Sequence, residues 1–173
     1  MPRTPLQGAA FIVGLWLALT LLSPLAVRGA ESSDDASDAE LRLMERDLHG
    51  AVNEFRRAHE LIALERDPAL DSVARRHSTD MATRRYLSHK TPEGANWVDR
   101  LERAGVRGFT MAGENVGQTN RRPPNTEILE GWKHSPVHRQ NLAARPFNRT
   151  GLGIARAADG TLYYTQLYLT FPR

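Results

Sequence analysis

With 173 residues, the chain is long enough for one domain and too short for two large ones. Its composition, 40% hydrophobic and 25% charged, is typical of a globular protein with a buried core and excludes a disordered or collagen-like chain. The lack of cysteine excludes disulfides, thiolate metal sites and a cysteine nucleophile. The formal net charge is only +3, and the arginines occur in scattered pairs without interleaved aromatic residues, so no nucleic-acid partner is expected.

Residues 1–29 have the pattern of a signal peptide. Arg3 precedes the apolar run Ala9–Leu22, which is shorter than the roughly 20 residues that a membrane span needs. Small residues near Gly29 would suit cleavage there. The sequence therefore predicts a secreted or periplasmic protein with no stable membrane span after cleavage. An uncleaved membrane anchor is the alternative interpretation.

The segment 30–47 is expected to be a flexible acidic leader, followed by a single domain over 48–173. Residues 31–40 hold five acids and no large apolar residue, so they offer little surface to bury. Apolar residues recur at helical spacing from Leu41 to about Leu61, which predicts the first helix.

Capping residues predict two further helices. Asp67-Pro68 begins the first, because the aspartate oxygen can accept from free amide groups and proline suits the first helical position. One face of that helix is apolar and is formed by Leu70, Val73, Ala74, His77 and Met81. Trp97–Ala104 forms a short helix that Gly105 can close. Like Phe55 and Trp132, Trp97 is expected to be a core residue.

The last third of the chain combines helices with strands. Asn125 is expected to cap a helix, and Ser135-Pro136 to start a turn or short helix through Leu142. Gly151–Ala157 and Thr161–Phe171 read as two strands joined by a hairpin turn. Helices followed by an antiparallel hairpin predict an α+β protein.

Histidines and acids in predicted loops are the residues that could carry chemistry. The sequence has no glycine-rich phosphate loop, no Gly-x-Ser-x-Gly elbow and no His-Glu-x-x-His helix. His89 follows a helix, and Glu114 lies 25 positions later in a second loop, around Gly113-Glu114-Asn115. Both side chains are candidate metal ligands or acid–base groups.

Several short motifs occur in the order typical of one family. Together they cover roughly Leu48 to Phe171 and resemble the CAP superfamily, which includes cysteine-rich secretory proteins, antigen 5 and plant pathogenesis-related class 1 proteins; the cysteine-free form is similar to its bacterial branch. The motifs are Leu87-Ser88-His89, Gly113-Glu114-Asn115, Gly131-Trp132, Ser135-Pro136-Val137-His138 and Tyr163-Tyr164-Thr165-Gln166. The resemblance implies an α-β-α sandwich with a central antiparallel sheet and a large open cleft.

The resemblance also implies roles for individual residues. Eukaryotic members place two histidines and two glutamates in the cleft, and the first of each corresponds to His89 and Glu114. The positions of the second glutamate and second histidine are Ser135 and Tyr163 here, so half of that set is missing. The candidate cleft residues are His89, Glu114, His138, Ser135, Asn141 and Tyr163.

A zinc site is one interpretation of three of these residues. If a helix continues through Ser135, His138 lies one turn further on the same face and could point into the cleft. His89, Glu114 and His138 would then suit zinc with an open fourth position. The alternative is that His138 and Asn141 only hydrogen-bond the backbone near the cleft.

Two functions compete on this basis. The first is an exported binding module whose cleft holds a lipid, sterol or cell-envelope ligand, and this needs no catalytic residue. The second is a hydrolase of peptide or envelope polymer, either metal-assisted or using Glu114 as general base with His89 as its partner. A structural or protein-interaction role would leave the same pattern as the first. The sequence identifies no catalytic residue and does not specify the oligomeric state.

Overall fold

The computed structural model describes Met1 and residues 33–172, with side chains from Ser37 onward. The signal peptide expected over 1–29 lies outside these residues. In the described part of the chain, no helix has both the length and the apolar character that a membrane crossing requires.

Four strands form one sheet with helices on both faces. The strand order is β1-β3-β4-β2, in which β3 and β2 run antiparallel to β4. The two-residue β1 pairs in parallel with the first two residues of β3. The elements in chain order are α1 (Ser33–Ala58), β1 (Glu65–Arg66), α2 (Pro68–Arg84), α3 (Trp97–Arg103), β2 (Met111–Thr119), α4 (Pro124–His134), α5 (Pro136–Ala143), β3 (Arg149–Arg156) and β4 (Leu162–Thr170). The predicted α+β class and antiparallel core of the sheet are confirmed.

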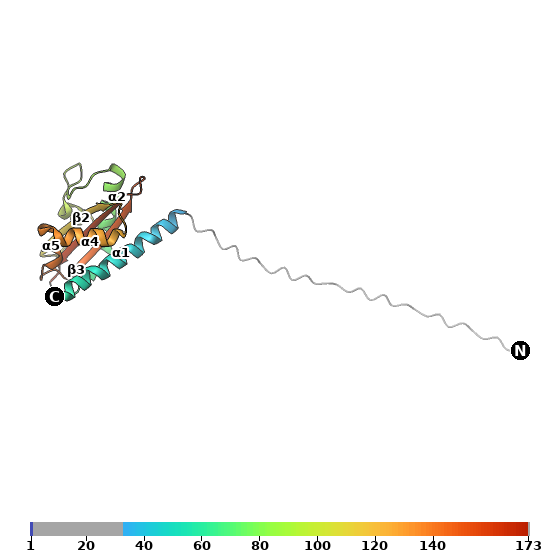
Figure 1. The fold of residues 1–173 in the computed structure, drawn as a ribbon, viewed down its shortest axis with the longest axis horizontal. Coiled ribbons are helices and arrows are strands. Elements are labelled where there is room, and N and C mark those ends of the chain that lie inside the picture. The colour runs from blue at the N-terminus through green and yellow to red at the C-terminus, as the bar shows by residue number, and fades with distance from the viewer. Residues whose placement is uncertain (2–32, 173) are drawn as a thin grey trace. The chain divides into compact units, whose positions relative to one another are not determined.

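The helices divide into two layers (Figure 1). Helices α1, α4 and α5 cover one face of the sheet, where Leu48, Trp132 and Leu142 pack with Tyr164 and Tyr168 of β4. Helices α2 and α3 cover the other face, where Leu70, Val73 and Leu101 pack with Leu167 and Leu169. Alternating residues of β4 thus supply both cores, and this is the α-β-α arrangement that the family resemblance implies.

Helix α2 begins where the sequence places it. The Asp67 carboxylate accepts from the amide of Ala69 at 2.8 Å and from that of Leu70 at 3.3 Å. All five residues of its predicted apolar face are buried. The helix packs so closely on β3 that a Cβ added at Gly153 would lie 2.2 Å from the backbone nitrogen of Arg75. A glycine is therefore required at this crossing.

Residues 33–47 differ from the flexible leader expected over 30–47. Helix α1 starts at Ser33, and within it Leu41 is 6% exposed while the Glu45 side chain is fully buried. The helical spacing of Leu41, Glu45 and Leu48 places all three on the face toward the sheet. The folded domain therefore extends N-terminally of residue 48, at least to Leu41.

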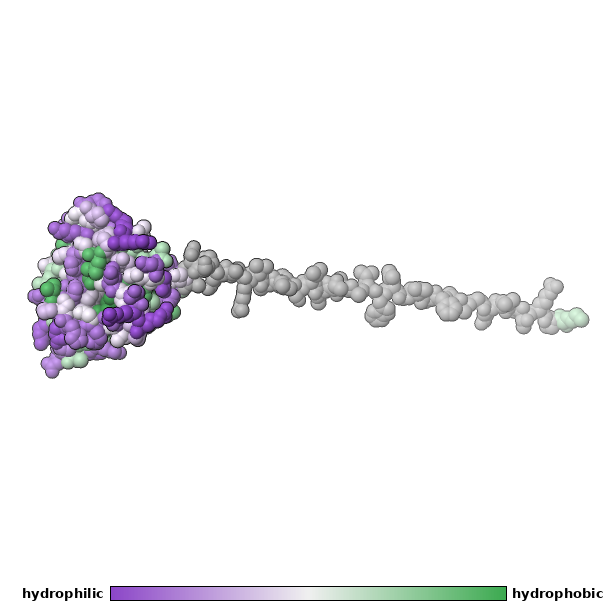
Figure 2. All heavy atoms as spheres, turned by 45° about the horizontal axis from the view of Figure 1, so that its top comes forward, coloured by the Kyte–Doolittle hydropathy of each residue, from purple (hydrophilic) through white to green (hydrophobic). Residues whose placement is uncertain are grey.

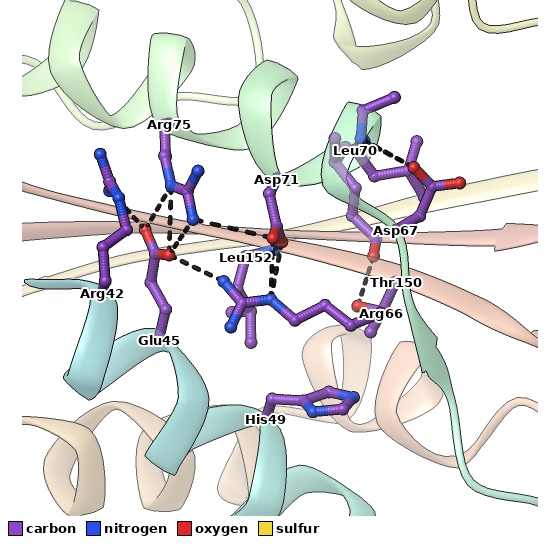
Figure 3. Close-up of polar contacts among 12 residues, drawn as sticks. Arg42, Glu45, His49, Arg66, Asp67, Leu70, Asp71, Arg75, Thr150 and Leu152 are labelled. Carbon is purple, nitrogen blue, oxygen red and sulfur yellow. Dashed lines mark hydrogen bonds and ion pairs between the residues drawn. The ribbon is translucent and has the colours of Figure 1, made fainter.

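Glu45 is the centre of a buried ion network (Figure 3). Its carboxylate accepts from Arg75 Nε at 2.9 Å, Arg66 Nη2 at 2.8 Å and the backbone amide of Ile154 at 3.2 Å. The hydrogen bond to Glu45 raises the pKa of Arg75. Next to it, Asp71 accepts from Arg66 Nε at 3.0 Å and from the amide of Leu152 at 2.8 Å. These contacts join α1, α2, β1 and β3.

Two local predictions are wrong for tertiary reasons. Gly113-Glu114-Asn115 belongs to β2 and not to a loop, and a Cβ added at Gly113 would lie 2.7 Å from the side-chain oxygen of Asn141, which would have to shift. Asn125 does not cap α4, which begins after Pro123 without a side-chain cap. The Asn125 amide instead donates to Met44 O at 2.8 Å, and its oxygen accepts from the hydroxyl of Tyr164 at 3.2 Å.

Candidate ligand-binding site

His89 and Glu114 meet beside the edge strand β2, as the sequence predicted. His89 Nδ1 lies 3.0 Å from Glu114 Oε1. The Glu114 side chain comes from β2 and is fully buried, whereas that of His89, in the loop after α2, is 39% exposed. Since a carboxylate only accepts, His89 must carry a proton on Nδ1, and its Nε2 is then free to contact a ligand.

Arg100 completes this contact from α3, and sequence reasoning missed it. Its Nη2 binds Glu114 Oε2, and its Nη1 donates to the backbone oxygens of His89 at 3.1 Å and Ala95 at 3.3 Å. The Asn96–Asp99 capping box fixes the start of α3 one turn before Arg100. Arg100 therefore connects α3, the loop and β2, and both oxygens of Glu114 are occupied.

His138 lies beside His89, although the route that predicted this is wrong. The expectation needed one helix through Ser135, but α4 ends at His134 and α5 starts at Pro136. Ser135 between them has extended backbone angles (φ −89°, ψ 119°). The turn nevertheless brings the two imidazole rings to a centroid distance of 6.3 Å. Burial, reinforced by His89, lowers the pKa of His138, which therefore favours its neutral form.

Two asparagines hold the backbone of this site. Asn141 Nδ2 donates to Glu114 O at 3.1 Å and to Asn115 Oδ1 at 2.9 Å. Asn115 Nδ2 in turn donates to His138 O at 3.1 Å and contacts the Tyr168 hydroxyl at 3.2 Å. Asn141 thus hydrogen-bonds backbone, as the alternative interpretation expected, but it also bonds the Asn115 side chain, and His138 takes part through its backbone oxygen.

Apolar side chains flank the two histidines. Trp97 is partly buried: it packs against the core between α2, α3 and the sheet, as predicted, and it also meets the His89 ring edge-on at 5.8 Å. Val137 and Leu87, close in sequence to the two histidines, are 68% and 46% exposed. Figure 2 shows separate apolar patches of this kind on an otherwise hydrophilic surface. The region thus offers apolar contact together with imidazole hydrogen-bonding groups.

Comparison with known proteins identifies the family. The family model described as CAP, the cysteine-rich secretory protein family, matches residues 49–168, which is more than half of the chain. The chain belongs to the CAP family.

Bacterial CAP proteins are among its relatives. A Bacillus subtilis protein, YkwD, is 28% identical over 108 residues, which cover 62% of this chain and 41% of that protein. A crystal structure of an extracellular protein containing an SCP domain, from Bacillus anthracis, is 31% identical, with a TM-score of 0.69, over 82% of this chain and 45% of that one. An outer surface protein of Borrelia burgdorferi shares the fold, with 19% identity and a TM-score of 0.68 over 75% of this chain and 93% of its own. The chain therefore spans less than half of the two Bacillus proteins.

Two expected cleft residues of this CAP domain do not join the His89 group. Tyr163 is 6% exposed and packs with Met81, Ala82 and Val116 in the core under α2. The Ser135 side chain forms no hydrogen bond within residues 37–172. The two positions that depart from the eukaryotic CAP pattern thus add nothing to the polar contacts around Glu114.

The expected zinc site does not fit this arrangement. Among the side chains that the structure describes, no group of three histidines or acids is placed to hold a metal ion. The reason lies in the local contacts, since one oxygen of Glu114 faces the cationic Arg100 and the other faces His89. A guanidinium beside the carboxylate would repel a metal cation there.

Proposed function

We propose that this CAP domain is an exported binding module whose site around His89 and His138 holds a lipid, sterol or cell-envelope ligand. Export is supported by the pattern of residues 1–29 and by the relatives described as extracellular and outer-surface proteins. Binding is supported by the contacts of the site.

The observation that carries this proposal is the closed set of contacts around Glu114. Its carboxylate is fully buried, and both oxygens are bound, one to Arg100 and one to His89. A general base must come within hydrogen-bonding distance of the proton that it removes. Because the Glu114 side chain is fully buried against Arg100 and His89, it is not placed to take a proton from a substrate, and its role is to hold the His89 ring in place.

The ligand class follows from the groups that remain accessible. His89 offers Nε2, and His138 offers a neutral ring that is partly buried. Val137 and Leu87, which lie close to the two histidines in the sequence, are exposed and apolar. A site with a small number of polar groups beside apolar side chains suits two kinds of ligand. One is a molecule with an apolar body that carries hydroxyl or amide groups, and the other is a glycan ring.

Mass spectrometry of extracts from the purified exported protein tests this function. We expect one ligand to co-purify with the natural chain and to be lost from a His89→Ala/His138→Ala variant. The matched control is His134→Ala, because the His134 side chain is 81% exposed and lies on α4. Equal recovery of that ligand from all three proteins, or no ligand in any of them, would contradict the proposal.

One observation favours hydrolysis as a second candidate. His89 Nδ1 contacts a buried carboxylate while the His89 side chain is 39% exposed, and a histidine oriented in this way by an acid is suited to act as a general base. In that case His89 would activate water, with Glu114 as its positioning residue. Chemical conversion of the extracted ligand by the natural protein, abolished in His89→Ala, would support this candidate over binding alone.

A further inference from the structure

A second hollow lies on the α2 and α3 side of the domain. Its volume is about 740 Å³, and neither His89 nor His138 lines it. Ala69, Val73 and Ala104 give it apolar surface, and its charged lining residues are Arg76, Asp80, Glu93, Arg100 and Arg103. The hollow thus differs from the site around His89, with which it shares Arg100, and its lining carries both charges.

The acids of this hollow already have partners. Glu93 accepts from Arg84 Nη2 at 2.7 Å and from Arg84 Nη1 at 3.1 Å. Asp80 accepts from the Tyr86 hydroxyl, and from Arg84 Nη1 at 3.4 Å. Arg84 therefore engages both carboxylates of the lining.

Two arginines of the lining are left without a carboxylate. Arg76, on α2, donates to Ser72 Oγ at 2.8 Å, and neither it nor Arg103, on α3, pairs with an acid among the side chains of residues 37–172. Both are exposed. His77 adds no charge to the wall, because its burial lowers its pKa. The available positive charge therefore comes from two guanidinium groups on two different helices.

We propose that this hollow binds an oxyanion, a phosphate or carboxylate group, between Arg76 and Arg103. Guanidinium groups present paired N–H donors that match the oxygens of phosphate and carboxylate. Ala69 and Val73 line the same hollow, so the molecule that carries the oxyanion can make apolar contacts beside the two guanidinium groups. The group can belong to a free anion or to the headgroup of an anionic lipid.

Titration of inorganic phosphate into the purified chain at low salt, followed by NMR chemical shifts, tests the proposal. We expect saturable binding that weakens roughly tenfold in Arg76→Gln/Arg103→Gln, since charged hydrogen bonds are lost. The matched control is Arg57→Gln/Arg107→Gln, which removes the same charge from exposed arginines that do not line the hollow. In that control the affinity should stay within about twofold. Because Arg76 and Arg103 are exposed, the test variant should fold, and Ala69→Trp offers an independent way to block the hollow without changing its charge.

Vesicles distinguish the two sources of the anion. If the group is a lipid headgroup, phosphatidylglycerol vesicles should retain the natural chain but not the Arg76→Gln/Arg103→Gln variant. Phosphatidylcholine vesicles should then retain neither protein. If it is a free anion, inorganic phosphate should bind with the same variant dependence and neither vesicle should retain the chain. The proposal is overturned if neither probe binds, or if the control variant weakens binding as much as the test variant does.

Discussion

Replacing Glu45 by alanine should destabilise the domain by about 3 kcal/mol. The side chain is fully buried, and its loss leaves the amide of Ile154, a residue only 2% exposed, without an acceptor. An unpaired buried amide costs roughly 1–3 kcal/mol. Breaking a fully buried ion pair costs about 3–5 kcal/mol, but Arg66 and Arg75 are 20% and 28% exposed and can recover some hydration. A total near the lower end of that range follows.

Urea and thermal unfolding measure this effect. For a domain of this size, about 3 kcal/mol corresponds to a fall in Tm of roughly 10 °C. The matched control is Glu54→Ala, because Glu54 lies on the same helix, is exposed and forms no ion pair within the described residues. A chain that starts at residue 48 should be destabilised at least as much as Glu45→Ala. Equal stability of the Glu45→Ala and Glu54→Ala variants would show that the ion network does not anchor α1.

Four further predictions follow from particular contacts. Arg100→Leu leaves the buried Glu114 carboxylate without its guanidinium partner, so we expect the free energy of unfolding in urea to fall by about 3–5 kcal/mol. The control variant Arg107→Leu should keep the free energy of unfolding of the natural chain. Gly153→Ala forces α2 away from β3 and should cost about 3 kcal/mol, whereas Gly50→Ala, which meets nothing within 4 Å, should gain about 0.5–1 kcal/mol. Calorimetric titration should show no tighter zinc binding to the natural chain than to Glu114→Gln, because Arg100 occupies one carboxylate oxygen; much tighter binding to the natural chain would restore the three-ligand site. Burial lowers the pKa of His77 and His138 below the usual 6.5, so as the pH falls the unfolded chain binds protons before the folded chain does. The free energy of unfolding should therefore fall as the pH drops below about 6.5. Greater stability at pH 5 than at pH 7.5 would contradict this.

Local chemistry explains which elements could be predicted from the sequence. Asp67 caps α2 through its own side chain, and the turn between β3 and β4 closes at Gly160, which has a φ of 86°. Both signals act within a few residues. The family motifs added the pairing of His89 with Glu114, which no local pattern specifies.

Long-range contacts explain what was missed. The glycines of β2 resemble a loop in the sequence, but Gly113 lies in a strand against which Asn141 of α5 packs closely. Arg100 and Glu45 are paired with charges 14 and 30 residues away, respectively, and the chain has many other arginines that are equally plausible partners by sequence alone. Only the packing of α3 on β2, and of α1 and α2 on the two faces of β3, selects these pairs.

Binding without turnover at the His89 site can be measured directly with the ligand recovered from the purified protein. That ligand is added in excess to the natural chain and to His89→Ala, and its chemical integrity is followed by mass spectrometry over many hours. We predict saturable binding to the natural chain, weaker binding to the variant, which lacks the imidazole that Glu114 holds in place, and intact ligand in both samples. Steady conversion of the ligand by the natural chain, absent in His89→Ala, would contradict the role of this site as a binding module.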